Sequence, residues 1–242
     1  MSKMSLKDFC EAGRVLALSG KEPEETVIEG QLLLAELLAN PDFLLDNMSA
    51  LTESPQDDDY LPIDINDITI YRDPLGHLSI RLFVWEPHVQ YPVHDHSSWG
   101  IMGCLKNELR ETKYRRLDDG SKGGYADLAV QAEAVLRAND TTFVLPYEKG
   151  IHRMMCHGSL PALSVHAYGK RGSRFINGYV PEQNAVYRMY PMKLHRRILA
   201  IKALETMRSD WACEILKFTA KDHNEVVRQV AKEALENIKK SK

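Results

Sequence analysis

The segment WEPHVQYPVHDHSSWGIMGCL, residues 85–105, combines the β-branched and aromatic residues of a strand with a central His94-Asp95-His96. Successive side chains of a strand point to opposite faces, so His94 and His96 share one face. Two imidazoles on one face can bind a single metal ion if a third ligand comes from elsewhere in the chain. This H-x-H pair is therefore the first candidate for a functional site.

The sequence around this segment favours a barrel of short strands. Between residues 66 and 190, turn signals such as Asp73-Pro74-Leu75-Gly76 and Asn139-Asp140 separate short β-type runs, with no helical pattern between them. Such spacing predicts an antiparallel barrel or sandwich, whose interior can hold a ligand site. The expected strands are residues 67–72, 77–85, 89–96, 98–105, 108–117, 129–137, 141–146, 151–156, 162–169 and 173–178.

Helical periodicity replaces the strand pattern at both ends of the chain. In the N-terminal part, one helix is expected to end at Gly20 and a second to begin at Pro23, followed by an acidic solvated loop at residues 52–60. After residue 190 the apolar spacing predicts three more helices, and NEVVRQVAKEALENI (224–238) weakly resembles a unit of HEAT-type repeats.

Three regions are therefore expected along the chain. The C-terminal helices are predicted to pack on the barrel or on a second subunit, and they are candidates for self-association or for binding another protein. The regions are an N-terminal helical segment packing on the barrel (1–64), a barrel that carries the site (65–190) and a C-terminal helical appendix (191–242).

Composition restricts the partners and the location. Hydrophobic residues make up 44% and charged residues 27% of the 242 residues, which is ordinary for a globular protein. A net charge of −3 gives no electrostatic reason to expect nucleic acid or an anionic membrane as a partner. The sequence has no apolar run of membrane-spanning length and no apolar signal core at its N-terminus. We therefore expect a cytoplasmic protein without a nucleic-acid or membrane partner.

The four cysteines of the chain are widely scattered. No two of them form a C-x-x-C pair, so neither a disulfide framework nor a thiolate zinc site is indicated.

A third metal ligand is available in the later part of the barrel. His152 follows the turn-like segment 146–149 and stands at the start of an expected strand. Three neutral imidazoles would leave a divalent ion with its full charge and with open positions for other ligands. The alternative is that His94 and His96 are half-buried strand residues and that His152 is an unrelated loop residue.

Three segments resemble the cupins, and among them the thiol dioxygenases related to cysteine dioxygenase. PVHDHSSWGIMGCLKNELRET (92–112) resembles the first metal motif of that family, LPYEKGIHRMMC (145–156) the second, and SVHAYG (164–169) its Ser-x-His-x-Tyr segment. The resemblance covers about residues 65–180. It implies a mainly β fold, a cupin barrel (a double-stranded β-helix or jelly roll), with helices before and after it.

The resemblance also implies a chemistry: Fe(II) as cofactor, and O2 together with a small thiol, such as cysteine or 3-mercaptopropionate, as substrates. The product would be the sulfinic acid. General cupins carry a glutamate ligand a few residues after H-x-H, but this chain has Trp99-Gly100-Ile101 there, which favours a three-histidine site. The ligands would be His94, His96 and His152, and the relay facing the substrate would be Ser164, His166 and Tyr168. Two alternatives stay open: a cupin that uses another divalent metal for different chemistry, and a non-catalytic binding cupin with a protein-binding tail.

Two features depart from the family pattern. Animal members cross-link a cysteine to the relay tyrosine, and Gly100 stands near that position here, as in many bacterial relatives, so no cross-link is expected. The family also holds the substrate carboxylate with an arginine or glutamine on an early strand, and Tyr71-Arg72 matches that context poorly.

A second arginine is the stronger candidate for this role. Arg81 lies within the apolar strand 77–85, on the same face as Phe83 and Trp85, where an unpaired charge is costly. We therefore expect Arg81 to bind a substrate carboxylate through its planar fork, with Arg72 as the second candidate and Trp85 as a wall of the pocket. The alternative is that Arg81 pairs with a structural acid or lies on a solvated face.

Overall fold

The computed structural model describes residues 3–40, 42–44, 66–207 and 209–240. The chain divides into two compact units, each described separately below. One contains the N-terminal helices and the strands, and the other contains the C-terminal helices. The expected acidic loop at residues 52–60 lies outside the described residues.

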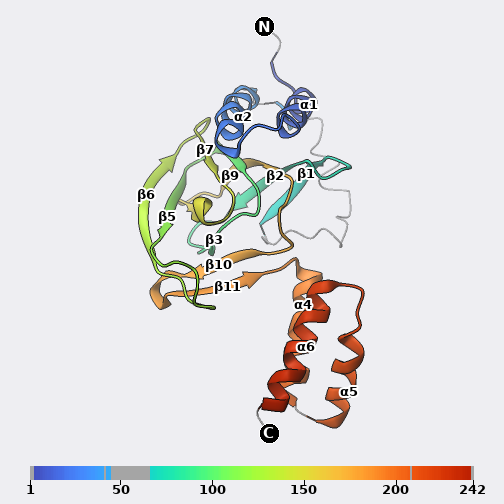
Figure 1. Cartoon of the computed structure of the whole chain (residues 1–242). Coiled ribbons are helices and arrows are strands. Elements are labelled where there is room, and N and C mark those ends of the chain that lie inside the picture. The colour runs from blue at the N-terminus through green and yellow to red at the C-terminus, as the bar shows by residue number, and fades with distance from the viewer. Residues whose placement is uncertain (1–2, 41, 45–65, 208, 241–242) are drawn as a thin grey trace. The chain divides into compact units, whose positions relative to one another are not determined.

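The strands of the first unit form two antiparallel sheets (Figure 1). The five-stranded sheet has the order β1 (Asp67–Arg72), β2 (Leu78–Trp85), β9 (Ala162–Gly169), β4 (Gly100–Lys106) and β7 (Thr141–Val144). The six-stranded sheet has the order β11 (Ala185–Met189), β10 (Ile176–Val180), β3 (Val93–His94), β8 (His152–Cys156), β5 (Leu109–Arg116) and β6 (Leu128–Leu136). Consecutive strands thus alternate between the two sheets at several points, as in a jelly roll, and the predicted mainly β barrel is confirmed.

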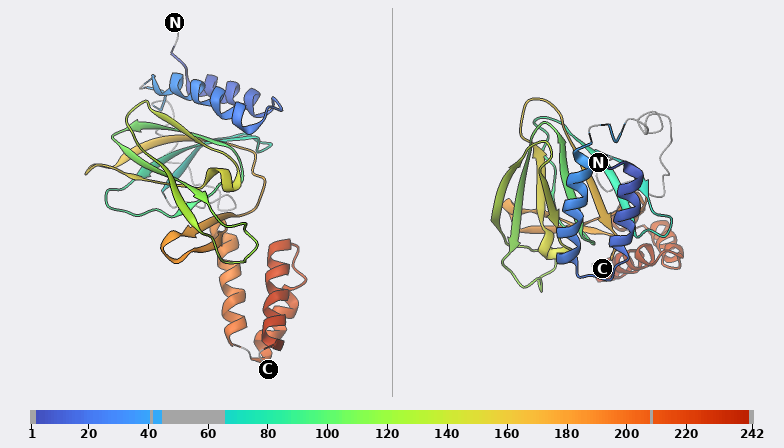
Figure 2. Two further views of the ribbon diagram at one scale, coloured as in Figure 1. Left: turned by 60° about the vertical axis from the view of Figure 1, so that its left-hand side comes forward. Right: turned by 90° about the horizontal axis from the view of Figure 1, so that it is seen from above.

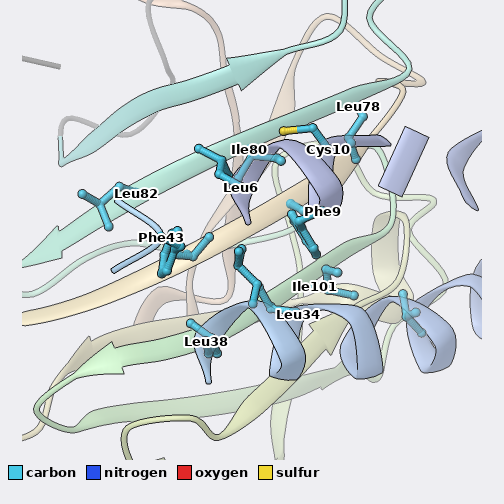
Figure 3. Close-up of a cluster of buried hydrophobic side chains, with 14 residues drawn as sticks. Leu6, Phe9, Cys10, Leu34, Leu38, Phe43, Leu78, Ile80, Leu82 and Ile101 are labelled. Carbon is cyan, nitrogen blue, oxygen red and sulfur yellow. The ribbon is translucent and has the colours of Figure 1, made fainter. Parts of the chain in front are cut away.

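Two helices cover the outer face of the five-stranded sheet (Figure 2). Helix α1 (Leu6–Ala17) begins with a capping box between Ser5 and Asp8, and α2 (Pro23–Leu38) begins with proline at its first position, as expected. Their apolar sides pack with one face of β2, β4 and β9. Figure 3 shows this cluster, which includes Leu6, Phe9, Leu34, Ile80 and Ile101.

The opposite face of the same sheet points into the barrel. Phe83 and Trp85 of β2 lie in a second cluster with Met102 of β4 and Met154 of β8. The alternation predicted for β2 is therefore confirmed: Leu78, Ile80 and Leu82 pack in the cluster with the helices, and Phe83 and Trp85 face the interior. This register places Arg81 inside the barrel as well, directly opposite His166 of β9.

Two expected strands differ from the structure by more than two residues at one end. Residues 89–96 were expected to form one strand, but only Val93 and His94 are paired as β3. Pro92 has no N–H to donate to a ladder, and a turn from Glu86 to Val89 precedes it. The expected strand 173–178 instead begins at Ile176 and continues to Val180, and the following strand β11 was not predicted.

The second unit is a small helical bundle with its own core. Helices α4 (Met192–Met207), α5 (Asp210–Thr219) and α6 (Glu225–Lys240) confirm the three predicted C-terminal helices. Ile201, Leu216 and Val227 are among the buried residues that join them. Trp211 and Phe218 of α5 are exposed large apolar side chains.

None of the helices in the described part of the chain is long and apolar enough to cross a membrane.

Candidate metal centre

The register of two short strands brings the predicted metal ligands together. His94 of β3 pairs directly with His152, the first residue of β8, so the two side chains emerge on the same face of the sheet. His96 lies just beyond β3, and all three histidines are buried. Their candidate ligand atoms lie within 4.8 Å of one another, which groups them around one point.

The hydrogen bonds of two histidines determine which ring nitrogen faces that point. Nδ1 of His94 donates to the carbonyl oxygen of Pro92 at 3.1 Å, and Nδ1 of His152 donates to Oε1 of Glu111 at 2.8 Å. The other nitrogen, Nε2, then carries a lone pair. Nε2 of His152 lies 3.0 Å from Nε2 of His96, so either a proton on His96 or a metal ion has to lie between these two nitrogens.

The surroundings of His96 and His152 favour the neutral imidazole, the form that binds a metal. Burial and the neighbouring His94 lower the pKa of His96 well below its ordinary value. Burial also lowers the pKa of His152, against the opposing effect of Glu111. These residues fit a divalent transition-metal ion bound by three nitrogens, with further positions open to other ligands.

Asp95, between His94 and His96, points away from the histidine cluster. Its carboxylate accepts hydrogen bonds from the backbone N–H of Asn177 (2.7 Å), from Nδ2 of Asn177 (2.6 Å) and from Oη of Tyr179 (3.1 Å). Both of these residues, Asn177 and Tyr179, belong to β10. Asp95 therefore joins the ligand segment to the neighbouring strand and is not itself a ligand.

A row of hydrogen bonds runs along β9 beside the metal centre. Oγ of Ser164 lies 2.7 Å from Nε2 of His166, and Nδ1 of His166 lies 2.8 Å from Oη of Tyr168. The row begins at Trp85, whose indole Nε1 lies 2.8 Å from Oγ of Ser164. The Tyr168 ring stacks on His96, with 5.3 Å between the ring centroids, so the row ends next to one of the three clustered histidines.

The chemistry of the donors gives this row a direction. An indole N–H can only donate, so Ser164 accepts from Trp85. Ser164 is completely buried, and among the described residues its only other hydrogen-bond partner is His166. A buried hydroxyl without an acceptor costs about 1–3 kcal/mol, so Ser164 donates to Nε2 and His166 donates from Nδ1. Tyr168 accepts that bond and keeps its own proton for another acceptor.

Arg81 lies inside the barrel but already has an acidic partner. Its Nη1 lies 2.6 Å from Oδ2 of Asp67 on β1, and the two side chains are 6% and 0% exposed. Its Nε is buried without a hydrogen-bond partner among the described residues, and its Cζ lies 5.8 Å from the Tyr168 ring centroid. Asp67 is thus the structural acid that would pair with Arg81 if Arg81 did not bind substrate. Among the described residues, Nε of Arg81 has no acceptor.

The other two predicted substrate-binding residues lie in different places. Arg72 ends β1 and pairs with Ser79, which is itself opposite Tyr168. Trp85 lines a small cavity of about 10 Å³ beside the histidines, which is room for about one water molecule. Its other lining residues are Asn66, Phe83, Tyr91, Pro92, His94, His152, Met154, His166 and Tyr168, so no Lys, Arg, Asp or Glu of the described residues lines it.

A family model described as cysteine dioxygenase type I matches residues 22–172, which is more than half of the chain. The chain belongs to this family. The structure is also similar to a cupin 2 conserved barrel domain protein from Salinispora arenicola CNS-205, with 16% identity, a TM-score of 0.33, and 48% of this chain and 87% of that chain covered. An RmlC-like cupin family protein with a double-stranded β-helix fold from Methanocaldococcus jannaschii is similar with 12% identity, a TM-score of 0.32, and 45% and 84% covered.

The residue opposite the Tyr168 ring is a glycine and not a cysteine. Gly100 is this residue of β4, and a glycine has no sulfur to form a cross-link with the tyrosine. A Cβ at this position would lie 2.7 Å from both Cδ1 and Cε1 of the Tyr168 ring, so glycine is required for the ring to lie there. Cys104 lies further along β4, opposite Ser164, and burial raises the pKa of its thiol to about 11.

Sequence reasoning missed two acidic residues that the structure places beside the site. Glu111 has the same parity on β5 as the buried Leu109, which could have indicated that it faces inward. Asp67 lies at the start of β1, and an aspartate at the end of a strand is typical of a turn. Only the three-dimensional pairing of β1 with β2 shows that Asp67 meets Arg81.

The contact between Gly100 and Tyr168 leads to a testable prediction. Gly100→Ala should lower the free energy of unfolding by about 1–3 kcal/mol, because the new methyl group forces the Tyr168 ring away from its position. Gly123→Ala is the matched control, because no atom lies within 4 Å of its added Cβ. Denaturant unfolding of both metal-free variants measures the difference, and equal stabilities would contradict the assigned packing.

Proposed function

We propose that this protein is a non-haem Fe(II) thiol dioxygenase. It would add both atoms of O2 to the sulfur of a small thiol, R–SH + O2 → R–SO2H, with a substrate such as cysteine or 3-mercaptopropionate. The observation that supports this most is the cluster of three buried histidines, which no carboxylate of the described residues joins, in a chain of the cysteine dioxygenase type I family.

The donor set suits the proposed substrate. His94, His96 and His152 would hold the iron, and because all three are neutral, an anionic thiolate can join them without excess negative charge. When bound, the iron would supply the site at which thiolate and O2 meet and the redox capacity for their reaction.

The residues around the ligands would position the substrate and one proton. Tyr168 accepts from His166, so its hydroxyl would present a proton towards the bound substrate. The aromatic walls of the cavity, Phe83, Trp85 and Tyr91, would exclude water from the reacting atoms.

We propose that Arg81 holds the carboxylate of the substrate. Asp67 would fix its guanidinium through Nη1, and the unused Nε would be the donor to the substrate. Arg72, at the end of β1, is the second candidate for this role.

We also propose a cytoplasmic location, without nucleic acid or membrane as a partner, in keeping with the net charge of −3. Self-association through the C-terminal helices stays a prediction, and the exposed Trp211 and Phe218 of α5 are where it would be tested first.

The function is tested by O2 uptake. Protein loaded anaerobically with Fe(II) should consume O2 with at least one of cysteine, 3-mercaptopropionate and cysteamine, and each O2 consumed should give one sulfinic acid by mass spectrometry. The same protein loaded with Zn(II) is the control, because zinc has no redox chemistry. If the iron-loaded protein consumes no O2 with any of the three thiols, the proposal is wrong, and metal analysis of the purified protein then separates another metal enzyme from a binding protein.

The role of Arg81 is tested by substrate preference. Arg81→Ala should be combined with Asp67→Asn, because removing only the arginine would leave a buried carboxylate uncompensated. The double variant should raise KM for carboxylate-bearing thiols roughly tenfold or more relative to cysteamine, since it loses one charge-assisted hydrogen bond.

Asp67→Asn alone and Arg72→Ala are the controls for this measurement. A selective effect in Arg72→Ala would transfer the role to that residue. Equal effects of the double variant on all three thiols would show that Arg81 does not bind the carboxylate.

A further inference from the structure

Glu111 is a buried carboxylate one hydrogen bond away from the metal centre. It lies on β5, next to β8, and its side chain is 3% exposed. Burying an ionised carboxylate costs several kcal/mol unless it is paired and hydrogen-bonded. Glu111 inside the barrel therefore needs partners that compensate for the cost of its burial.

Each oxygen of Glu111 has a defined partner. Oε1 lies 2.8 Å from Nδ1 of His152, and Oε2 accepts from Oγ1 of Thr142 at 2.6 Å. Nζ of Lys113 lies 3.8 Å from Oε2. One oxygen thus faces the N–H of the imidazole, the other faces the O–H of Thr142, and the ammonium group of Lys113 lies nearby. This surrounding suits a carboxylate that accepts hydrogen bonds and donates none.

His94 and His152 differ in the group that accepts the hydrogen bond from Nδ1. His94 donates to a neutral backbone carbonyl, that of Pro92. His152 donates to a full negative charge, and a carboxylate bonded to a ligand histidine orients the ring and makes it a stronger donor to the metal. Trp99, Gly100 and Ile101 stand at the positions after H-x-H where a carboxylate ligand would be. Glu111 can instead offset part of the charge of a bound ion from behind His152.

We propose that Glu111 is the positioning residue of the metal centre. It holds His152 with a proton on Nδ1, so that the lone pair on Nε2 faces His94 and His96, and its negative charge strengthens metal binding from one hydrogen bond away. This inference rests on the proposed three-histidine metal site, but it does not depend on which reaction that site catalyses.

Metal affinity and the His152 tautomer test the proposal without any activity assay. Affinity for Co(II) is measured anaerobically by competition with a chelator. Removing a residue that is hydrogen-bonded to a metal ligand typically weakens metal binding roughly 10- to 100-fold. We expect a loss of Co(II) affinity of this size in Glu111→Ala. Glu111→Gln keeps an oxygen for Nδ1 of His152 and removes only the charge, because the Thr142 hydroxyl can turn to accept from the amide. The Co(II) affinity of Glu111→Gln should lie between that of Glu111→Ala and that of the unaltered protein.

A matched control lies on the neighbouring strand. Glu133 of β6 accepts from Oγ1 of Thr112 at 3.1 Å but is exposed and has no contact with a histidine ligand among the described hydrogen bonds. Glu133→Gln should bind Co(II) as tightly as the unaltered protein.

Nitrogen-15 NMR of the metal-free protein gives the second measurement. The resonances of His152 are assigned by comparison with His152→Gln, and they should show a proton on Nδ1 in the unaltered protein. This measurement stands even if Glu111→Ala does not fold.

Two results would overturn the proposal. One is unaltered Co(II) affinity in Glu111→Ala, or in Glu111→Gln if that is the only variant that folds. The other is a proton on Nε2 of His152 in the unaltered protein. The absence of thiol-dependent O2 uptake would instead overturn the proposed function and leave this inference standing.

Discussion

The antiparallel pairing of His94 with His152 is the contact on which the metal centre depends. It joins two short segments that are far apart in the sequence and turns both imidazoles to one face of the six-stranded sheet. β3 contributes only two residues to this sheet, so the ligand segment also needs other attachments. Asp95 provides one through Asn177 and Tyr179 of β10. The helices on the opposite sheet bury its outer face and leave the inner face for the site.

Polar groups are buried on both sides of this pair, and each group is oriented by a specific neighbour. Glu111 stands behind His152, and Trp85 stands at the start of the row that ends at Tyr168. Because a carboxylate only accepts and an indole N–H only donates, these two residues set the direction of the hydrogen bonds between them and the site. The barrel can therefore hold neutral imidazoles with their lone pairs towards one point and a tyrosine proton beside it.

The sequence was sufficient for features that depend on local periodicity. Alternation along 77–85 placed Arg81 and Trp85 inside the barrel, and the spacing of Ser164, His166 and Tyr168 placed them in one row. The family resemblance identified the region of the three histidines, and the family match confirms that membership. Features that depend on pairing between distant strands could not be read from the chain. The pairing of Arg81 with Asp67, the hydrogen bond between Glu111 and His152 and the register of His94 against His152 each depend on which strand lies alongside. That Trp85 forms a wall of the substrate pocket stays a prediction. Its indole also donates a hydrogen bond to Ser164.

We expect three neutral histidines, with no protein carboxylate, to hold one metal ion. X-ray absorption spectroscopy of the iron-loaded protein tests this most directly, because it reports the atoms bound to the metal. The expected spectrum has three imidazole nitrogens bound to the iron, with only water or other exogenous oxygen besides them, and a new sulfur neighbour when the substrate thiol is added. A spectrum that required a protein carboxylate, or fewer than three imidazoles, would contradict it.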